Sequence, residues 1–79
     1  MEITGRESKI KQAEARLEAA RLRVKAAHQR DSAQAYYRQA GHPIYPGQET
    51  ICIGKGQVLE SLAEATEAEA DLIEAKAGL

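Results

Sequence analysis

Apolar residues recur with helical spacing through the first forty positions of the chain. Isoleucine, leucine and valine lie seven residues apart, and alanines fill the complementary positions of each heptad. The stripe consists of Ile3, Ile10, Ala13, Leu17, Ala20, Val24 and Ala27. This pattern is typical of a helix that pairs with another helix in a coiled coil, and it marks the stripe as a candidate self-association seam. A second, weaker apolar line consists of Ala15, Ala19, Leu22 and Ala26. Two apolar lines indicate contact with more than one neighbour.

The first helix is predicted over residues 4–40. Thr4 and Glu7 have the spacing of a capping box, in which each side chain satisfies a backbone N–H at the helix start. The residues that follow favour helix, and Gly41 with Pro43 ends it. A polar stretch around Asp31 leaves open a break into two shorter helices.

A second helix is predicted over residues 56–77, with Gly78 just beyond its end. Its apolar stripe consists of Leu59, Leu62, Thr66, Ala70, Ile73 and Ala77. Carboxylates are expected on the opposite face, at Glu60, Glu64, Glu67, Asp71 and Glu74. The flanks carry Val58, Ala65, Ala68, Leu72 and Ala75, so most of this helix could be buried in a bundle.

The segment between the helices, residues 41–55, has a different composition. It holds both prolines, the only cysteine and several β-branched residues. Pro46-Gly47 is a type II turn signature, and Thr50, Ile51 and Ile53 have strand character. These features predict a small β-hairpin or an ordered Ω-like loop at the tip of the helices.

Composition limits the core that this chain can build. The 79 residues make a single domain without Phe or Trp, and much of the 43% hydrophobic fraction is alanine, which buries little area. Cys52 has no partner for a disulfide, and one cysteine with two histidines forms no metal-ligand cluster. Oligomerisation is therefore the expected source of additional stability. We also expect no cofactor, and a cytoplasmic protein without a membrane span or a signal peptide.

The net charge of −1 hides an asymmetry between the two halves. Residues 1–40 carry nine Lys/Arg and five Asp/Glu, whereas residues 55–79 carry two Lys and six Asp/Glu. Pairing Ala40 with Gln57 would place Ala77 near residue 20, which leaves the start of the first helix uncovered. A symmetric homodimer, antiparallel through the first helix, would cover it and form an all-α, four-helix bundle. The basic helices would then pair with acidic ones.

The tip is the best candidate for binding a partner protein, because long ordered connections tend to be functional. Its candidate contact residues are Tyr36, Tyr37, His42, Ile44, Tyr45, Ile51 and Ile53. The chain is therefore expected to be a non-enzymatic interaction module, a small dimeric adaptor or inhibitor of the type found in phages and mobile elements. One face of the tip could equally plug the end of the bundle.

Two alternatives remain. The basic residues Arg16, Arg23 and Arg30 suggest a nucleic-acid-binding dimer, although glutamates lie among them and aromatic residues do not. A purely structural coiled-coil assembly is the other. Gly54-Lys55-Gly56 lacks the upstream glycine of a phosphate-binding loop, and Cys52 lacks a basic neighbour that would activate it, so no enzyme is predicted.

Overall fold

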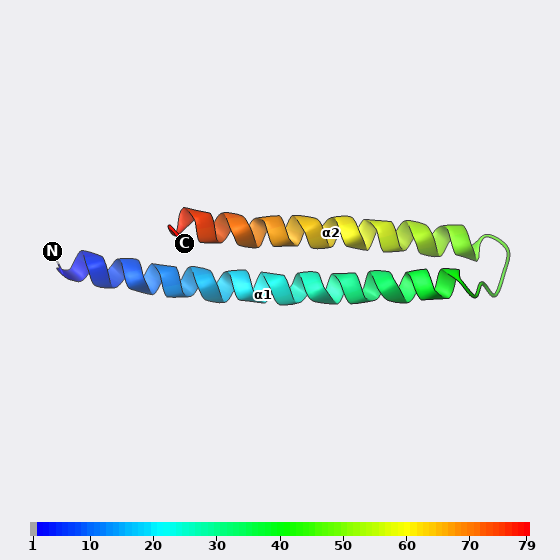
Figure 1. Cartoon of the computed structure of the whole chain (residues 1–79), viewed down its shortest axis with the longest axis horizontal. Coiled ribbons are helices and arrows are strands. Elements are labelled where there is room, and N and C mark those ends of the chain that lie inside the picture. Colours follow the sequence, from blue (N-terminus) through cyan, green and yellow to red (C-terminus); the bar gives the residue numbers. More distant parts are fainter. Residues whose placement is uncertain (1) are drawn as a thin grey trace.

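The computed structural model is a pair of antiparallel helices that lie side by side (Figure 1). α1 (Glu2–Ala40) and α2 (Gln48–Lys76) are joined by residues 41–47. The structure describes the backbone from Glu2 to Leu79 and the side chains from residue 5 onward. Its Cα atoms extend over 67 × 13 × 11 Å, so the molecule is a thin rod. The predicted all-α helical hairpin is confirmed.

α1 is one continuous helix as predicted, and the break that the sequence left open near Asp31 does not occur. Gln29 and Ala33 flank this stretch and both face α2, so packing carries the helix through the polar residues. The helix begins at Glu2, two residues before the predicted start; the side chains of Ile3 and Thr4 lie outside the described residues. It ends at Ala40 as predicted.

The connection contains the predicted type II turn. Gly47 has φ 90° and ψ −13°, a left-handed conformation that glycine adopts without a steric cost. The N–H of Gln48 donates to the Tyr45 carbonyl at 3.2 Å and closes the turn. The Gln48 side chain is buried and accepts the backbone N–H of Ile44. This bond ties the middle of the connection to the first residue of α2.

The β-hairpin predicted within residues 41–55 is wrong, because no strand forms among residues 2–79 and α2 starts at Gln48. β-propensity spans only about 1 kcal/mol and yields to tertiary packing. As a helix, this segment buries Gln48, Cys52 and Gly56 at a spacing of four residues, on the face that meets α1. The helix thus adds two turns to the interface that a strand pair would not provide.

α2 ends at Lys76, one residue before the predicted end, in a Schellman motif. Gly78 has φ 78°, and its N–H donates to the Ala75 carbonyl at 3.1 Å. The N–H of Leu79 donates to the Glu74 carbonyl at 2.9 Å. The predicted role of Gly78 is confirmed.

The two helices meet along a line of small side chains, which we call the inner seam. The buried residues are Ala15, Ala19, Ala26, Ala33 and Ala40 of α1, and Cys52, Gly56, Ala63, Thr66 and Ala70 of α2. No large side chain is fully buried in the described part of the chain. At Gly56 an added Cβ would lie 2.5 Å from the Tyr37 ring, so this ring rests directly on the backbone of α2.

The heptad stripe of α1, whose Ile, Leu and Val residues recur every seven positions, does not face α2. Ile10, Leu17 and Val24 are 51%, 53% and 57% exposed. Leu17 lies two residues from both Ala15 and Ala19, which is about 200° around a helix, so it points away from the seam. The weaker alanine line of the sequence is therefore the one that packs within the chain. On α2, Leu62 was predicted to lie on the inner stripe, but it is exposed. Its neighbour Ala63 is buried in the seam instead.

The register also differs from the predicted one. The Gln12 side chain donates to the Ala77 carbonyl at 3.3 Å, so Ala77 lies beside residue 12 and not residue 20. Only the first ten or so residues of α1 extend past α2 (Figure 1). The apolar stripe is bare because of the direction it faces, not because α2 is too short.

Candidate interaction surfaces

The outer stripe of α1 is an exposed apolar line on the side away from α2. Its described members are Ile10, Ala13, Leu17, Ala20, Val24 and Ala27. The large residues alternate with alanines at spacings of three and four. This is the geometry of a seam for a further helix, so the structure leaves the predicted self-association residues accessible.

α2 carries an outer stripe of its own, which the sequence interpretation missed. Its residues recur every seven positions and all are exposed: Ile51, Val58, Ala65 and Leu72. The regular spacing was present in the sequence. Ile51 was predicted to lie in a strand, so it was not recognised as part of a helical stripe. Val58, Ala65 and Leu72 were then interpreted as the flanks of a buried helix.

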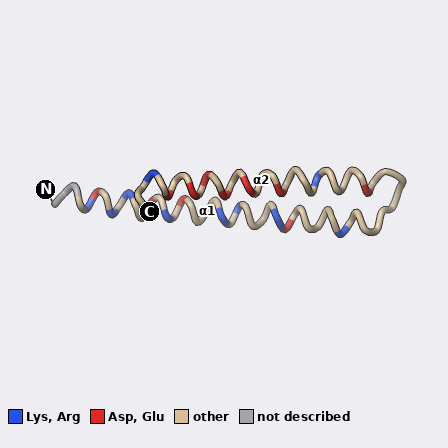
Figure 2. The backbone as a smooth tube through the Cα atoms, turned by 45° about the horizontal axis from the view of Figure 1, so that its top comes forward, with Lys and Arg blue, Asp and Glu red and all other residues tan. Residues whose placement is uncertain are grey.

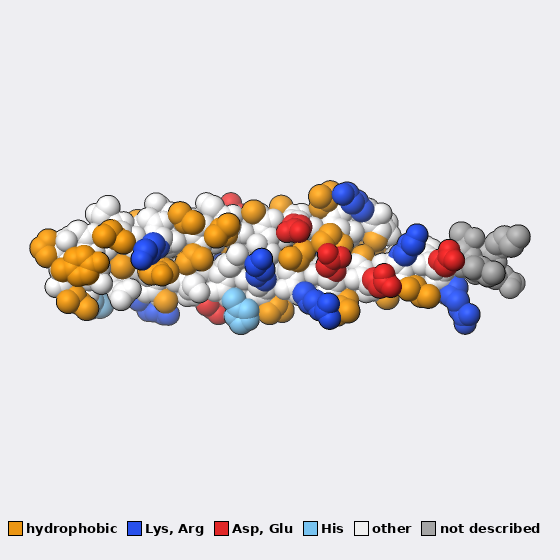
Figure 3. Space-filling model, turned by 180° about the vertical axis from the view of Figure 1, so that it is seen from behind, with side chains coloured by type: hydrophobic (Ala, Val, Ile, Leu, Met, Phe, Trp, Pro, Cys, Tyr) orange, Lys and Arg blue, Asp and Glu red, His pale blue; other side chains and the backbone are white. Residues whose placement is uncertain are grey.

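The tip residues do not form one patch. Ile44 is 84% exposed and Tyr45 is 51% exposed, both in the connection, where His42 is also exposed. Ile51 and Ile53 would share a face in a strand, but in a helix they lie about 200° apart. The structure therefore places Ile51 on the outer stripe of α2 and leaves Ile53 apart from it. Hydrophobic side chains still crowd this end of the hairpin (Figure 3).

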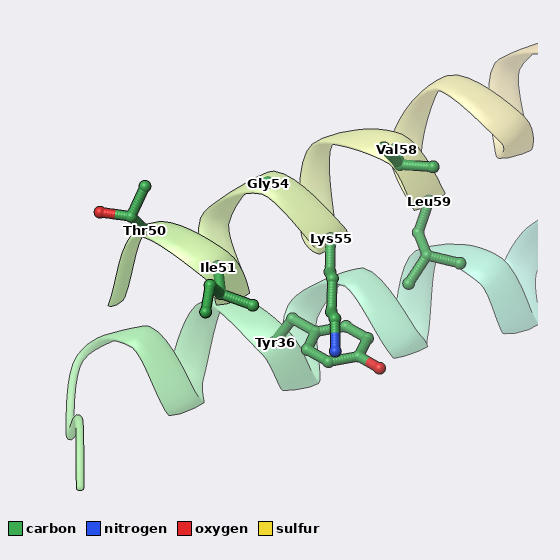
Figure 4. Close-up of a pocket in the computed structure, with 7 residues that line it drawn as sticks. All are labelled: Tyr36, Thr50, Ile51, Gly54, Lys55, Val58 and Leu59. Atoms are coloured by element: carbon green, nitrogen blue, oxygen red, sulfur yellow. The ribbon is translucent and has the colours of Figure 1, made fainter. Parts of the chain in front are cut away.

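The two tyrosines are half-buried where α1 and α2 meet near the tip. The ammonium of Lys55 lies 5.5 Å from the centre of the Tyr36 ring, close enough for a cation–π contact (Figure 4). A hydrogen bond with Glu60 raises the pKa of Tyr37. Both rings thus help to join the helices and remain only partly accessible to a partner.

Ion pairs run along one edge of the inner seam. Arg23 contacts Asp71 at 3.0 Å and also Glu74, and Arg30 contacts Glu67. The Arg30 hydrogen bond lowers the pKa of Glu67, and the Arg23 bond, helped by the charge of Arg16, lowers that of Glu74. The acidic residues of α2 were predicted opposite the seam, but these lie beside it, facing basic α1 (Figure 2). Two of the three arginines considered for nucleic acid are therefore paired with carboxylates of the same chain.

A polar pair interrupts the alanine seam at its centre. The Thr66 hydroxyl lies 3.0 Å from the Gln29 amide oxygen and 2.8 Å from the Leu62 carbonyl, so its single proton has an acceptor within reach although the residue is buried. An alanine-only seam has little to distinguish one register from another. This pair gives the seam a fixed reference point, as single polar residues do in coiled coils.

The residues considered for phosphate binding or catalysis, Gly54 to Gly56 and Cys52, lie inside α2 or in the seam between the helices. Gly54, Lys55 and Gly56 lie within α2, not at its start, so their N–H groups lie inside the helix and do not form a phosphate cradle. Cys52 is 4% exposed, and its thiol lies 3.8 Å from the Gln39 amide oxygen. Over the part of the chain that the structure describes, no group of His, Cys, Asp and Glu could hold a metal ion. Nor do the described helices include one long and apolar enough to cross a membrane.

Comparison of the chain with protein-family models, curated proteins and solved structures finds no match.

Proposed function

We propose that this protein is a non-catalytic protein–protein interaction module that acts as an assembly of hairpins. One observation carries this proposal: the small side chains are inside and the large ones are outside. Among the residues whose side chains the structure describes, the buried apolar ones are alanines and one cysteine, Leu22, Leu59 and Ile73 are half-buried, and eleven large hydrophobic residues are at least 37% exposed. Burial yields roughly 25 cal/mol per Å², so most of the hydrophobic free energy is available only through association.

A second copy fits the outer stripe of α1 in the antiparallel orientation. When Leu17 lies opposite Ala20 of the partner subunit, every other large residue of the stripe also meets an alanine. Ile10 then faces Ala27 of the partner subunit, and Val24 faces Ala13 of the partner subunit. The same register brings Glu14 beside Arg21 of the partner subunit. The match of large residues with alanines therefore supports a homodimer in which α1 is central and α2 lies at each side.

The connection between the helices supports the partner-binding part of the proposal. Ile44 is the most exposed large hydrophobic residue at 84%, and its N–H is held by the buried Gln48 side chain. An apolar residue on a fixed backbone loses little conformational entropy when it binds. We infer that Ile44 and Tyr45 engage a protein partner as an adaptor or inhibitor would.

The proposal is tested by the mass of the protein in solution, measured by light scattering behind size exclusion. The intact protein should have at least twice the chain mass of 8.6 kDa. Replacing Ile10 and Leu17 with Glu should lower the mass, because each charge would be buried without a partner in the α1 pairing. Helicity by circular dichroism shows whether the variant remains folded.

A matched control replaces Ser32 and Ala35 of α1 with Glu. Both residues are exposed and lie off the outer stripe, so the mass should not change. A monomeric intact protein, or equal losses in the two variants, would contradict the proposal.

A further inference from the structure

The outer stripe of α2 continues around the helix into a row of small residues. Gly54, Ser61 and Ala75 lie three positions after Ile51, Val58 and Leu72, and Ala68 lies three positions after Ala65. Large and small residues thus alternate at spacings of three and four in the first part of α2 and again at Leu72 and Ala75, while Ser61, Ala65 and Ala68 form a run of small residues between them. Val58 is 60% exposed and Leu72 is 52% exposed, so this surface has no cover within the chain.

The alternation is complementary to itself when two copies of α2 run antiparallel. If Leu72 lies opposite Gly54 of the partner subunit, then Val58 lies opposite Ala68 of the partner subunit. In the same register Ile51 meets Ala75 of the partner subunit. A parallel pairing would place large residues against large ones and leave gaps at the small ones. The spacing therefore favours the antiparallel orientation.

The surface is hollowed where this register needs room. Gly54 exposes bare backbone between Thr50, Ile51 and Val58, and these residues line an open apolar groove (Figure 4). A second groove adjoins it, between Gly54 and Leu62. A Cβ added at Gly54 would meet nothing within 4 Å, so the glycine is not required by packing inside the chain. Because glycine weakens a helix by about 1 kcal/mol relative to alanine, its place here points to something outside the chain.

Charges agree with the same register. It brings Lys55 beside Glu69 of the partner subunit, and the two-fold symmetry repeats this pair. It also brings Leu62, which is 47% exposed, beside Leu62 of the partner subunit at the centre. Lys55 is already held over the Tyr36 ring, so its ammonium stays at the edge of the groove. The groove at Gly54 and the Lys55–Glu69 pair favour this register, although it also brings Glu64 beside Glu64 of the partner subunit and the small residue Ala65 opposite Ser61 of the partner subunit.

We propose that the outer face of α2 binds the same face of a second copy of this chain, antiparallel, with Leu72 of the partner subunit seated in the groove at Gly54. This contact is separate from the α1 pairing, because the two outer stripes lie on different helices and both point away from the inner seam. It extends the proposed function: an intact protein that uses both faces assembles beyond a dimer.

The first experiment isolates the α2 contact. In the variant with Ile10→Glu and Leu17→Glu the α1 pairing is blocked, and the α2 contact should leave a dimer of twice the 8.6 kDa chain mass. Adding Gly54→Leu should convert this dimer to a monomer, because leucine fills the groove. Leucine is also the better helix former, so helicity should be kept or increased.

A charge exchange tests the register. On the same α1-blocked background, Lys55→Glu should raise the dimer dissociation constant about tenfold, since two attractive pairs become repulsive. Adding Glu69→Lys should restore it. Lys25→Glu makes the same charge change on exposed α1 and should have little effect.

The outcomes separate the two proposals. A monomeric α1-blocked variant that keeps its helicity overturns the α2 contact and leaves the α1 dimer standing. An α1-blocked variant with the same dimeric mass as the intact protein overturns the α1 pairing and supports the α2 contact. If the α1-blocked variant loses its helicity, Gly54→Leu in the otherwise native chain decides: a reduced mass supports the α2 contact and an unchanged mass overturns it.

Discussion

The inner seam and the outer stripes of this hairpin are built from opposite kinds of side chain. Ala19, Ala26 and Ala63 are fully buried between the helices, whereas Leu17, Val58 and Leu72 are about half exposed or more. In an ordinary helical domain the large residues fill the core and the small ones lie wherever space is short. Here the inner seam sets how closely and in which register the helices lie, and it contributes little burial. The hairpin therefore keeps large apolar side chains on two exposed faces, one on each helix.

The largest effect should come from placing a large residue in the inner seam. Ala26→Leu inserts three carbons where the alanine is fully buried, so the helices must separate along their length. We expect a loss of about 1–3 kcal/mol in the free energy of unfolding, measured by chemical denaturation at fixed protein concentration. Ala35→Leu makes the same change at an exposed site of α1 and should stay within about 0.5 kcal/mol of the native protein. Equal effects at the two sites would mean that the seam tolerates bulk.

A smaller change at the closest approach of the helices sharpens the same contrast. Gly56→Ala puts a methyl group 2.5 Å from the Tyr37 ring, so the ring must move off the seam. We expect a loss of about 1 kcal/mol in thermal or chemical unfolding, despite the better helix propensity of alanine. Gly5→Ala is the control, since its new methyl group meets nothing within 4 Å and should stabilise the helix slightly. A stabilising Gly56→Ala would show that Tyr37 leaves the seam without cost.

The smallest effect should come from the ion pairs at the edge of the seam. The pKa values of Glu67 and Glu74 are lowered in the folded chain, so their contribution to stability is present above their usual pKa of 4.5 and is lost as the pH falls through the lowered values. Changing both to Gln should flatten the pH dependence of stability below pH 4.5 and reduce its sensitivity to salt. The loss at neutral pH should be small, because these pairs are exposed to solvent.

Glu18→Gln with Asp31→Asn is the matched control for this titration. It removes two exposed carboxylates of α1 that the structure does not place in an ion pair with α2. The acid sensitivity should then follow that of the native chain. An identical flattening in both variants would assign the effect to net charge and not to the pairs.

The C-terminal ends of both helices and the turn between them were readable from the sequence, because local chemistry determines them, whereas the start of α2 was placed eight residues too late. Ala40 and Gly78 mark helix ends, and Pro46-Gly47 forms the expected turn. The strand predicted around Ile51 failed for a physical reason. β-branched residues tolerate a helix when it buries a neighbouring face, and Cys52 with Gly56 supplies that face.

The direction in which each stripe faces was harder to predict. A heptad of Ile, Leu and Val is the stronger hydrophobic signal, and the sequence analysis expected the second helix to leave only its start uncovered. Within one chain, however, the helices pack through the alanine line. Small residues such as Ala26 on α1 and Ala63 on α2 let the two helices approach closely along nearly their whole shared length. Sequence periodicity reveals that two seams exist, and it does not say which of them is filled by the chain itself.

The hairpin connection has a mechanical consequence. Contacts between the helices span an increasing length of chain with distance from the turn: 13 residues for Gln39 and Cys52, 37 for Gln29 and Thr66, and 65 for Gln12 and Ala77. Folding can therefore proceed from the turn, with each contact closing a loop only slightly longer than the one before. Tension that separates the two ends of the open side would release these contacts one after another, as in a zipper. A load applied along the outer stripes, parallel to the helices, would instead be shared by all the contacts between α1 and α2 at once.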